Sequence, residues 1–263
     1  MNTRTTAQRV KSIPLGLALF ASVVALPAGA QSNTLRVQIN SDIRSTDPGT
    51  NRDDNTDAVV LHMVEGLVAL REDTSVGPLL ASKVEVAPGG LSYTFSLRDG
   101  VRFHNGSLLT AQDVVWSWKR YLDPATGWRC LPEFDGKGVT KVVSVEAPNP
   151  KTVVFKLERA TGLFLETMAR ADCGGSGIVH KSSLGADGKW KEPVGTGPYK
   201  LKEWKRGQYV DLARFDGYAS RPESRDGFTG GKKAEIENLR YMIIPDASAA
   251  KAALYSAAID VFV

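Results

Sequence analysis

Hydrophobic and polar residues alternate in several short stretches of the chain, and this period of two predicts β-strands. In the stretch SYTFSL, Tyr93, Phe95 and Leu97 share one face, while the polar residues between them face the opposite way. The same pattern, bounded by turn-forming residues, predicts further strands at residues 34–39, 83–86, 139–145, 152–157 and 236–244, and a hairpin of 197–204 with 208–215.

Other segments carry apolar residues at helical spacing. The dipeptide Asn105-Gly106 favours a tight turn because it tolerates positive φ. Beyond it, Thr110 and Asp113 form the signature of a capped helix start, so a helix is expected over about 111–121. Three more helices are predicted, at a segment with Val60, Met63, Val64 and Leu67 on one face, at residues 162–168, and after Pro245. Strands mixed with helices in this order predict an α+β or α/β fold.

The N-terminal segment differs from the rest in kind. Three basic residues precede an uncharged apolar run, SIPLGLALFASVVALPAGA, which ends on small residues. This order is typical of a secretory signal peptide, so cleavage is expected after Ala30. A transmembrane anchor is the alternative, but Pro14 and Pro27 leave the apolar run too short to span a bilayer comfortably. We therefore expect an exported protein.

The overall composition is that of a globular protein, with 42% hydrophobic and 24% charged residues among 263. The formal net charge is +4, but residues 1–30 contain three basic residues and no acid, so the mature chain is expected to carry +1. The remaining basic residues are interspersed with acids rather than gathered in one patch. No nucleic-acid partner is therefore expected.

Both cysteines, Cys130 and Cys173, lie in the part that is expected to be exported. An even number of cysteines in an oxidising compartment favours a disulfide, here closing a loop of roughly forty residues and stabilising the fold by about 3–4 kcal/mol. Two separate thiols, or a nucleophilic pair of a cysteine with His180, are the alternatives. His62 and His104 lack the neighbours that metal-ligand spacing requires, so no metal and no cofactor are expected.

Three glycine-rich stretches approach catalytic or phosphate-binding motifs without matching them. GGSGI lacks a glycine two positions after Ser176, which a nucleophile elbow requires. GTGPYK and GFTGGKK lack the Gly-Lys-Ser/Thr ending of a phosphate-binding loop. No enzymatic activity is predicted, and a secreted hydrolase that depends on Ser176 or Cys173 is kept as an alternative.

The order of these segments resembles one protein family. SYTFSLRDGVRFHNGSLLTAQDVVWSWKRYLDPATG resembles the signature region of the peptide-, dipeptide- and nickel-binding proteins of bacterial ABC importers, which form solute-binding family 5. Four more stretches resemble motifs of that family in the same order: TDPGTNRDDNTDAVVLHMVEGLV, PNPKTVVFKL, GTGPYKLKEW and IPDASAAKAALYSAAIDV. The resemblance covers nearly all of residues 34–263.

The resemblance implies a two-lobed fold like that of the type II periplasmic binding proteins, with mainly the first lobe present. Two such lobes close over a solute, here a peptide or similar small molecule, and deliver it to an ABC permease in the inner membrane. We expect a signal peptide at 1–30 and the first lobe at 31–245. Because family members are longer, we expect residues 246–263 to be the start of a truncated crossover into the second lobe. A non-enzymatic, monomeric periplasmic receptor is expected, and a truncated interaction fragment without a transport role is the alternative.

The resemblance also suggests part of a ligand site, at Arg52, Asp53, Asp54, Trp128, Cys173 and Gly174. The first three lie on a loop that borders the ligand cleft in relatives, the tryptophan in a loop that offers an aromatic wall, and the last two beside the cleft. Acids before a helix are also favoured by the helix dipole, and a loop tryptophan also packs in cores. The charged residues that hold peptide termini in relatives come mostly from the part that this chain lacks. Weak or undetectable peptide binding is therefore expected of residues 31–263.

Overall fold

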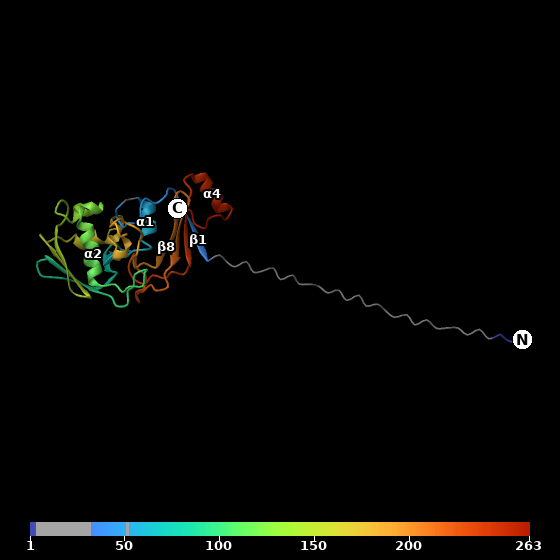
Figure 1. The fold of residues 1–263 in the computed structure, drawn as a ribbon, viewed down its shortest axis with the longest axis horizontal. Coiled ribbons are helices and arrows are strands. Elements are labelled where there is room, and N and C mark those ends of the chain that lie inside the picture. Colours follow the sequence, from blue (N-terminus) through green and yellow to red (C-terminus); the bar gives the residue numbers. More distant parts are fainter. Residues whose placement is uncertain (4–32, 51–52) are drawn as a thin grey trace. The chain divides into compact units, whose positions relative to one another are not determined.

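The computed structural model of the chain describes residues 1–3, 33–50 and 53–263 (Figure 1). The chain divides into two units, Met1–Ser32 and Asn33–Val263, and the fold described below is that of the second unit. The predicted signal peptide and its cleavage site after Ala30 lie outside the described residues. In the ranges given above, no helix has both the length and the hydropathy needed to cross a membrane.

The first sheet has four strands in the order β1-β10-β9-β8. Their bounds are Thr34–Ile39 for β1, Tyr199–Lys205 for β8, Tyr209–Arg214 for β9 and Asn238–Ile243 for β10. Strands β1 and β10 run parallel, and the other neighbours run antiparallel. Helix α1, Asp54–Val60, packs on one face of this sheet, where its buried residues join those of β8, β9 and β10 in one core.

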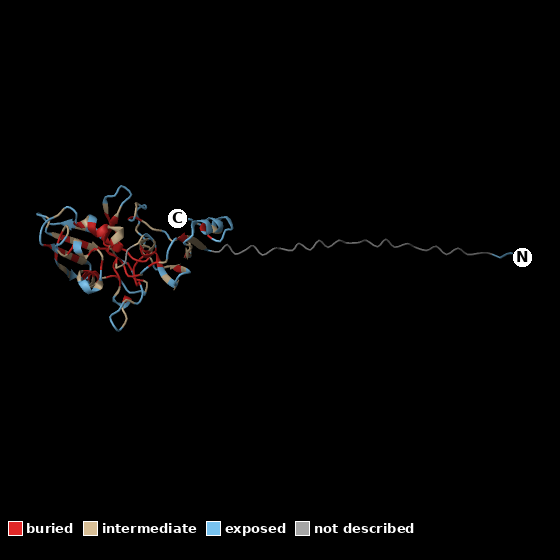
Figure 2. Cartoon of the chain, turned by 90° about the horizontal axis from the view of Figure 1, so that it is seen from above, coloured by how far each residue is buried: buried red, intermediate tan, exposed pale blue. Residues whose placement is uncertain are grey.

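The second sheet has four antiparallel strands in the order β4-β5-β7-β6. Their bounds are Ala81–Val86, Ser92–Leu97, Val142–Asn149 and Thr152–Leu157 for β4, β5, β6 and β7. Helix α2, Ala111–Leu122, lies against this sheet, and its Trp118 ring sits 4.9 Å from the ring of Phe155 on β7 (Figure 1). The buried residues of this core and of the first core fill the interior of the unit (Figure 2).

The remaining elements lie outside these two sheets. The remaining strands and α-helices are β2 (Val68–Leu70), β3 (Val76–Pro78), α3 (Phe164–Ala169) and α4 (Ala247–Tyr255). The 3₁₀ helices are η1 (Pro124–Thr126), η2 (Leu131–Glu133), η3 (Ala171–Ser176) and η4 (Lys181–Ser183). After α4 the chain returns to the first sheet, where Val261 pairs in parallel with Val37 of β1.

Several local predictions are confirmed by the structure. The carboxylate of Asp113 accepts hydrogen bonds from the backbone N–H of Thr110 at 2.9 Å and from its hydroxyl at 2.7 Å, so the capped start of α2 is where the sequence places it. Gly106 has a φ of 85°, as the predicted turn requires. The alternating stretch SYTFSL forms β5, in which Tyr93, Phe95 and Leu97 are all buried.

The predicted helix through Val60, Met63, Val64 and Leu67 is wrong, because α1 ends at Val60. The backbone carbonyl of His62 accepts a hydrogen bond from the N–H of Tyr199 at 3.1 Å, and that of Met63 accepts one from Gly197 at 3.0 Å. These carbonyls are therefore not available for a continuing helix. The close approach also explains the motif GTGPY, since a Cβ on Gly197 would lie 2.4 Å from the carbonyl oxygen of His62. The predicted strand at 139–145 is displaced to Val142–Asn149, and β2 and β3 are not predicted from the sequence.

Candidate functional site

Three segments that are far apart in the sequence meet at one place, which we call the junction: residues 47–49, 128–130 and 172–175. The backbone N–H of Arg129 donates to the carbonyl of Gly49 at 2.9 Å. The indole N–H of Trp128 donates to the carbonyl of Cys173 at 3.1 Å. Helix α1, which begins at Asp54, contacts η3, and η3 carries the third segment.

The junction is packed so closely that two of its positions require glycine. Gly49 has a φ of 71°, and a Cβ added to it would lie 2.6 Å from the carbonyl oxygen of Cys173. Gly174 has a φ of 67°, and its added Cβ would lie 2.6 Å from the backbone nitrogen of Gly49. Both positions combine a left-handed backbone with a steric clash, so any side chain there would separate the segments.

A disulfide joins Cys130 to Cys173, with 5.6 Å between their Cα atoms. It is the covalent link between the second and third segments of the junction. Both residues are buried, and the described part of the chain holds no free cysteine. The bond removes the thiol that a nucleophilic pair with His180 would need, and it leaves the side chain of Cys173 without access to a solute.

The predicted acidic residues lie at the start of α1. The carboxylate of Asp53 caps the helix by accepting hydrogen bonds from the N–H of Thr56 at 2.9 Å and from its hydroxyl at 2.7 Å, and it forms an ion pair with Arg44 at 3.3 Å. Capping is thus the role that the structure gives Asp53. Asp54 is exposed beside it. Arg52, the third predicted residue of this loop, lies outside the described residues.

Trp128 lies in the core and does not form an exposed aromatic wall. It is 2% exposed, its ring stacks on that of Phe134 at 5.3 Å, and it lies 4.6 Å from the ring of Tyr121 on α2. Direct contact of Trp128 with a solute stays a prediction. Gly174 is also buried, and its contribution is the close backbone packing of the junction.

Charged side chains border the junction. The guanidinium of Arg170 donates two hydrogen bonds to the carboxylate of Asp172, at 3.0 and 2.8 Å. The guanidinium of Arg129 forms an ion pair with the same carboxylate at 3.3 Å. The hydrogen bonds to Asp172 raise the pKa of Arg170. Glu133 completes the cluster, 3.4 Å from Arg170. Neither arginine is among the site residues expected from the sequence. The predicted disulfide is the signal that could have found them, because pairing Cys130 with Cys173 brings the stretches RCLPE and RADCGG together.

A buried ion pair positions the loop that leads into the junction. Arg120 of α2 donates two hydrogen bonds to the carboxylate of Asp47, and both side chains are mostly buried. Burial raises the pKa of Asp47, and the guanidinium opposes that shift. Arg120 also lies over the ring of Trp190, whose N–H donates to the hydroxyl of Thr46 at 3.0 Å. The Thr-Asp-Pro motif therefore ties this loop to α2 and to a second distant segment.

The exposed chemistry of the junction suits a polar solute. Negative carboxylates and positive guanidinium groups lie at its border, where they can form ion pairs and hydrogen bonds with a solute. Within the described ranges, no three histidine, cysteine, aspartate or glutamate side chains are grouped so that they could hold a metal ion. A cavity of about 730 Å³ lies elsewhere, between α1, the starts of β1 and β10, and residues 225–236.

Comparison with known proteins places this fold in one class. Over 87% of the chain, the structure matches the binding protein AgaA of A. tumefaciens R10 in complex with agropinic acid, with a TM-score of 0.72 and 27% identity. Over 86% of the chain it matches DppA from Helicobacter pylori in complex with the peptide STSA, with a TM-score of 0.72 and 26% identity. The class is therefore that of the periplasmic binding proteins of ABC transporters.

The particular family follows from the sequence. Residues 75–263 match the model of the bacterial extracellular solute-binding proteins, family 5, and the chain belongs to that family. It is 30% identical over 197 residues to the oligopeptide-binding protein OppA of Bacillus subtilis (strain 168). The chain spans 36% of the length of that relative and 43% and 45% of the two matched structures. Membership and the relatives' names assign the chain to binding proteins and not to enzymes.

Proposed function

We propose that this chain forms the first lobe of an extracytoplasmic receptor of an ABC importer, which binds peptides or similar small solutes in an interlobe cleft and delivers them to a membrane permease. The observation that carries the proposal is the junction, where three distant segments and a disulfide form a closely packed unit whose border carries charges of both signs. In this proposal the protein is exported through residues 1–30, works in the periplasm as a monomer, and needs no nucleic acid.

Peptides are the solute class that the charges at this surface favour. A short peptide carries an amino group and a carboxylate, and the junction offers a partly exposed carboxylate on Asp172 and a partly exposed guanidinium on Arg129. The names of OppA and DppA support the same class. One lobe supplies only part of the contacts of a two-lobed site, while the entropic cost of holding the solute remains, so binding by residues 31–263 is expected to be weak.

Saturation-transfer difference NMR with residues 31–263 tests the solute class, because the method detects solutes that bind weakly. Four pools are compared: di- to tetrapeptides, opines, nickel–histidine complexes and oligosaccharides. The expected result is a signal from the peptide pool alone, reduced by reversing the charge of Arg129 with Arg129→Glu. Lys189→Glu, at an exposed position on another loop, is the matched control. A signal from another pool alone, or from none, would reject the peptide assignment.

The intact mass of the protein from its native source tests export. A mature chain that begins at Gln31 and lacks two hydrogens is expected, from signal cleavage after Ala30 and from the bond between Cys130 and Cys173. A retained N-terminus in the periplasmic fraction would contradict the proposed route of export.

A further inference from the structure

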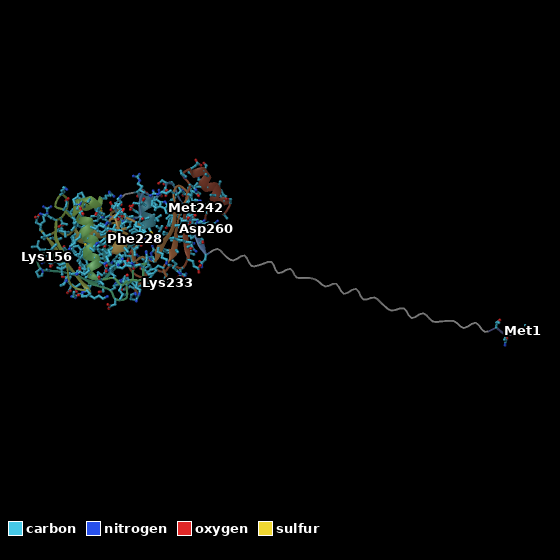
Figure 3. All side chains as sticks on the ribbon, in the orientation of Figure 1. Met1, Lys156, Phe228, Lys233, Met242 and Asp260 are labelled. Carbon is cyan, nitrogen blue, oxygen red and sulfur yellow. A yellow bond between two sulfur atoms is a disulfide. The ribbon has the colours of Figure 1, made fainter. Side chains whose placement is uncertain are left out.

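A long segment without helix or strand, residues 215–236, connects β9 to β10, and we call it the strap. Loops of this length usually carry a function when they are ordered. Arg221 of the strap donates to the backbone carbonyls of Leu79 at 3.0 Å and Ala81 at 2.9 Å, and the N–H of Phe228 donates to Leu70 at 2.8 Å. In Figure 3 the strap residues Phe228 and Lys233 are labelled between Lys156 of the second sheet and Met242 of the first. The strap is therefore held in place by defined contacts.

The strap also holds a buried carboxylate. The side chain of Glu65 is fully buried, and it accepts hydrogen bonds from the hydroxyl of Tyr218 at 2.9 Å and from the ammonium of Lys232 at 3.1 Å, both on the strap. Thr196 of the GTGPY motif donates a third bond at 3.2 Å. A buried carboxylate is tolerated only when it is paired and hydrogen-bonded in this way. Burial, and after it Glu65, raises the pKa of Tyr218, which keeps its hydroxyl protonated as a donor.

Glu65 is linked to the junction through its own backbone. Its carbonyl accepts the N–H of Ile178 at 2.9 Å. The next residue, Gly66, lies so close to η3 that an added Cβ would be 2.1 Å from the carbonyl oxygen of Gly175. A small cavity of about 30 Å³ is lined by Phe228 and Lys232 of the strap together with Gly175. A shift of Glu65 would therefore be passed directly to the third segment of the junction.

We propose that Glu65 is a positioning residue of the junction. The strap fixes its carboxylate through Lys232 and Tyr218, and the Glu65-Gly66 backbone then fixes the position of Gly175. Glu65 does not touch the solute, and it acts through the segment that does. This inference rests on the proposed function, because it is that function which assigns the junction to solute.

Hydrogen exchange without any ligand tests the proposed link. The amides of Gly175, Gly177 and Ile178 report on the junction, since each donates one of the hydrogen bonds that hold the segment. In Lys232→Met, these amides should exchange about 10-fold faster than in the wild type, while the amides of β5 and β7 keep their rates. Lys233→Met is the matched control, since it removes the same charge one residue away. Lys232→Arg, which keeps the charge, should restore slow exchange.

Further variants keep the test decisive. If Lys232→Met does not fold, Tyr218→Phe removes a single hydroxyl from the same carboxylate and should raise exchange at the same amides. Unchanged junction amides together with faster exchange of the strap amides of Phe228 and Gly231 would overturn the proposal. So would an equal increase at all amides, which indicates a loss of global stability. Tripeptide-induced NMR shifts of the wild type are recorded separately, so failure of solute binding is distinguished from failure of the link.

Discussion

Removing the disulfide should destabilise the protein strongly, because the bond closes a long loop. Cys130 and Cys173 are separated by 43 residues, and for a loop of this size the chain-entropy model gives a contribution of about 4 kcal/mol. The double variant Cys130→Ala/Cys173→Ala should therefore lose about 4 kcal/mol of unfolding free energy. The disulfide stabilises the fold because it lowers the entropy of the unfolded chain. Its removal should therefore give a more expanded unfolded state as well as a lower midpoint of unfolding.

Urea unfolding followed by tryptophan fluorescence measures this loss, since Trp128 is buried beside Cys173. With slopes of about 2–3 kcal/mol per molar urea, the midpoint should fall by about 1.3–2 M. The reduced wild type should unfold near the variant, which separates the effect of the bond from that of the substitutions. A loss below about 1 kcal/mol, or two reactive thiols in the oxidised, unfolded wild type, would refute the reasoning.

Three more predictions follow from other contacts. Asp47→Ala should lower the free energy of unfolding in urea by about 3–5 kcal/mol, because it leaves Arg120 buried and unpaired. The double variant Asp47→Ala/Arg120→Met should lose less than the sum of the two single variants, and additive losses would contradict this. Gly197→Ala should cost about 2–3 kcal/mol because of the clash with the carbonyl of His62, whereas Gly162→Ala, which meets no atom, should stay within about 0.5 kcal/mol; equal effects would contradict the steric argument. Burial lowers the pKa of His62 to about 4, so as the pH falls the unfolded state takes up a proton before the folded state does. The free energy of unfolding should therefore fall by roughly 2–3 kcal/mol from pH 6.5 to pH 4, relative to that of His62→Phe. Parallel pH profiles of the two proteins would contradict the shift.

Local patterns predict much of the fold because their causes lie within a few residues. The alternation in β5 and the capping box of Thr110 with Asp113 depend on neighbours in sequence, and both are found where they are expected. The end of α1 depends instead on Gly197 and Tyr199, which lie more than a hundred residues away and take the carbonyls of the next turn. No helical periodicity can reveal that competition.

The candidate site is predictable in part for the same reason. The resemblance singles out Trp128 and Gly174, which lie in the junction, and Asp53, which caps α1, but it does not give the direction of their side chains. Trp128 points into the core because three aromatic rings surround it there. Arg129 and Arg170 become neighbours only once the disulfide and η3 are in place. Charge clusters built across such distances are not visible in a single sequence.

In the proposed function the junction faces the solute, and an NMR titration shows whether it does. Labelled protein of residues 31–263 is titrated with trialanine to about 10 mM, a range suited to the weak binding expected of one lobe. We expect shifts of the amides of Asp47 and Gly49 and of those at 128–130 and 172–175. In the strap, only the residues that contact Glu65 should shift. Shifts that instead gather around the 730 Å³ cavity at residues 225–236, or no shift at all, would contradict it.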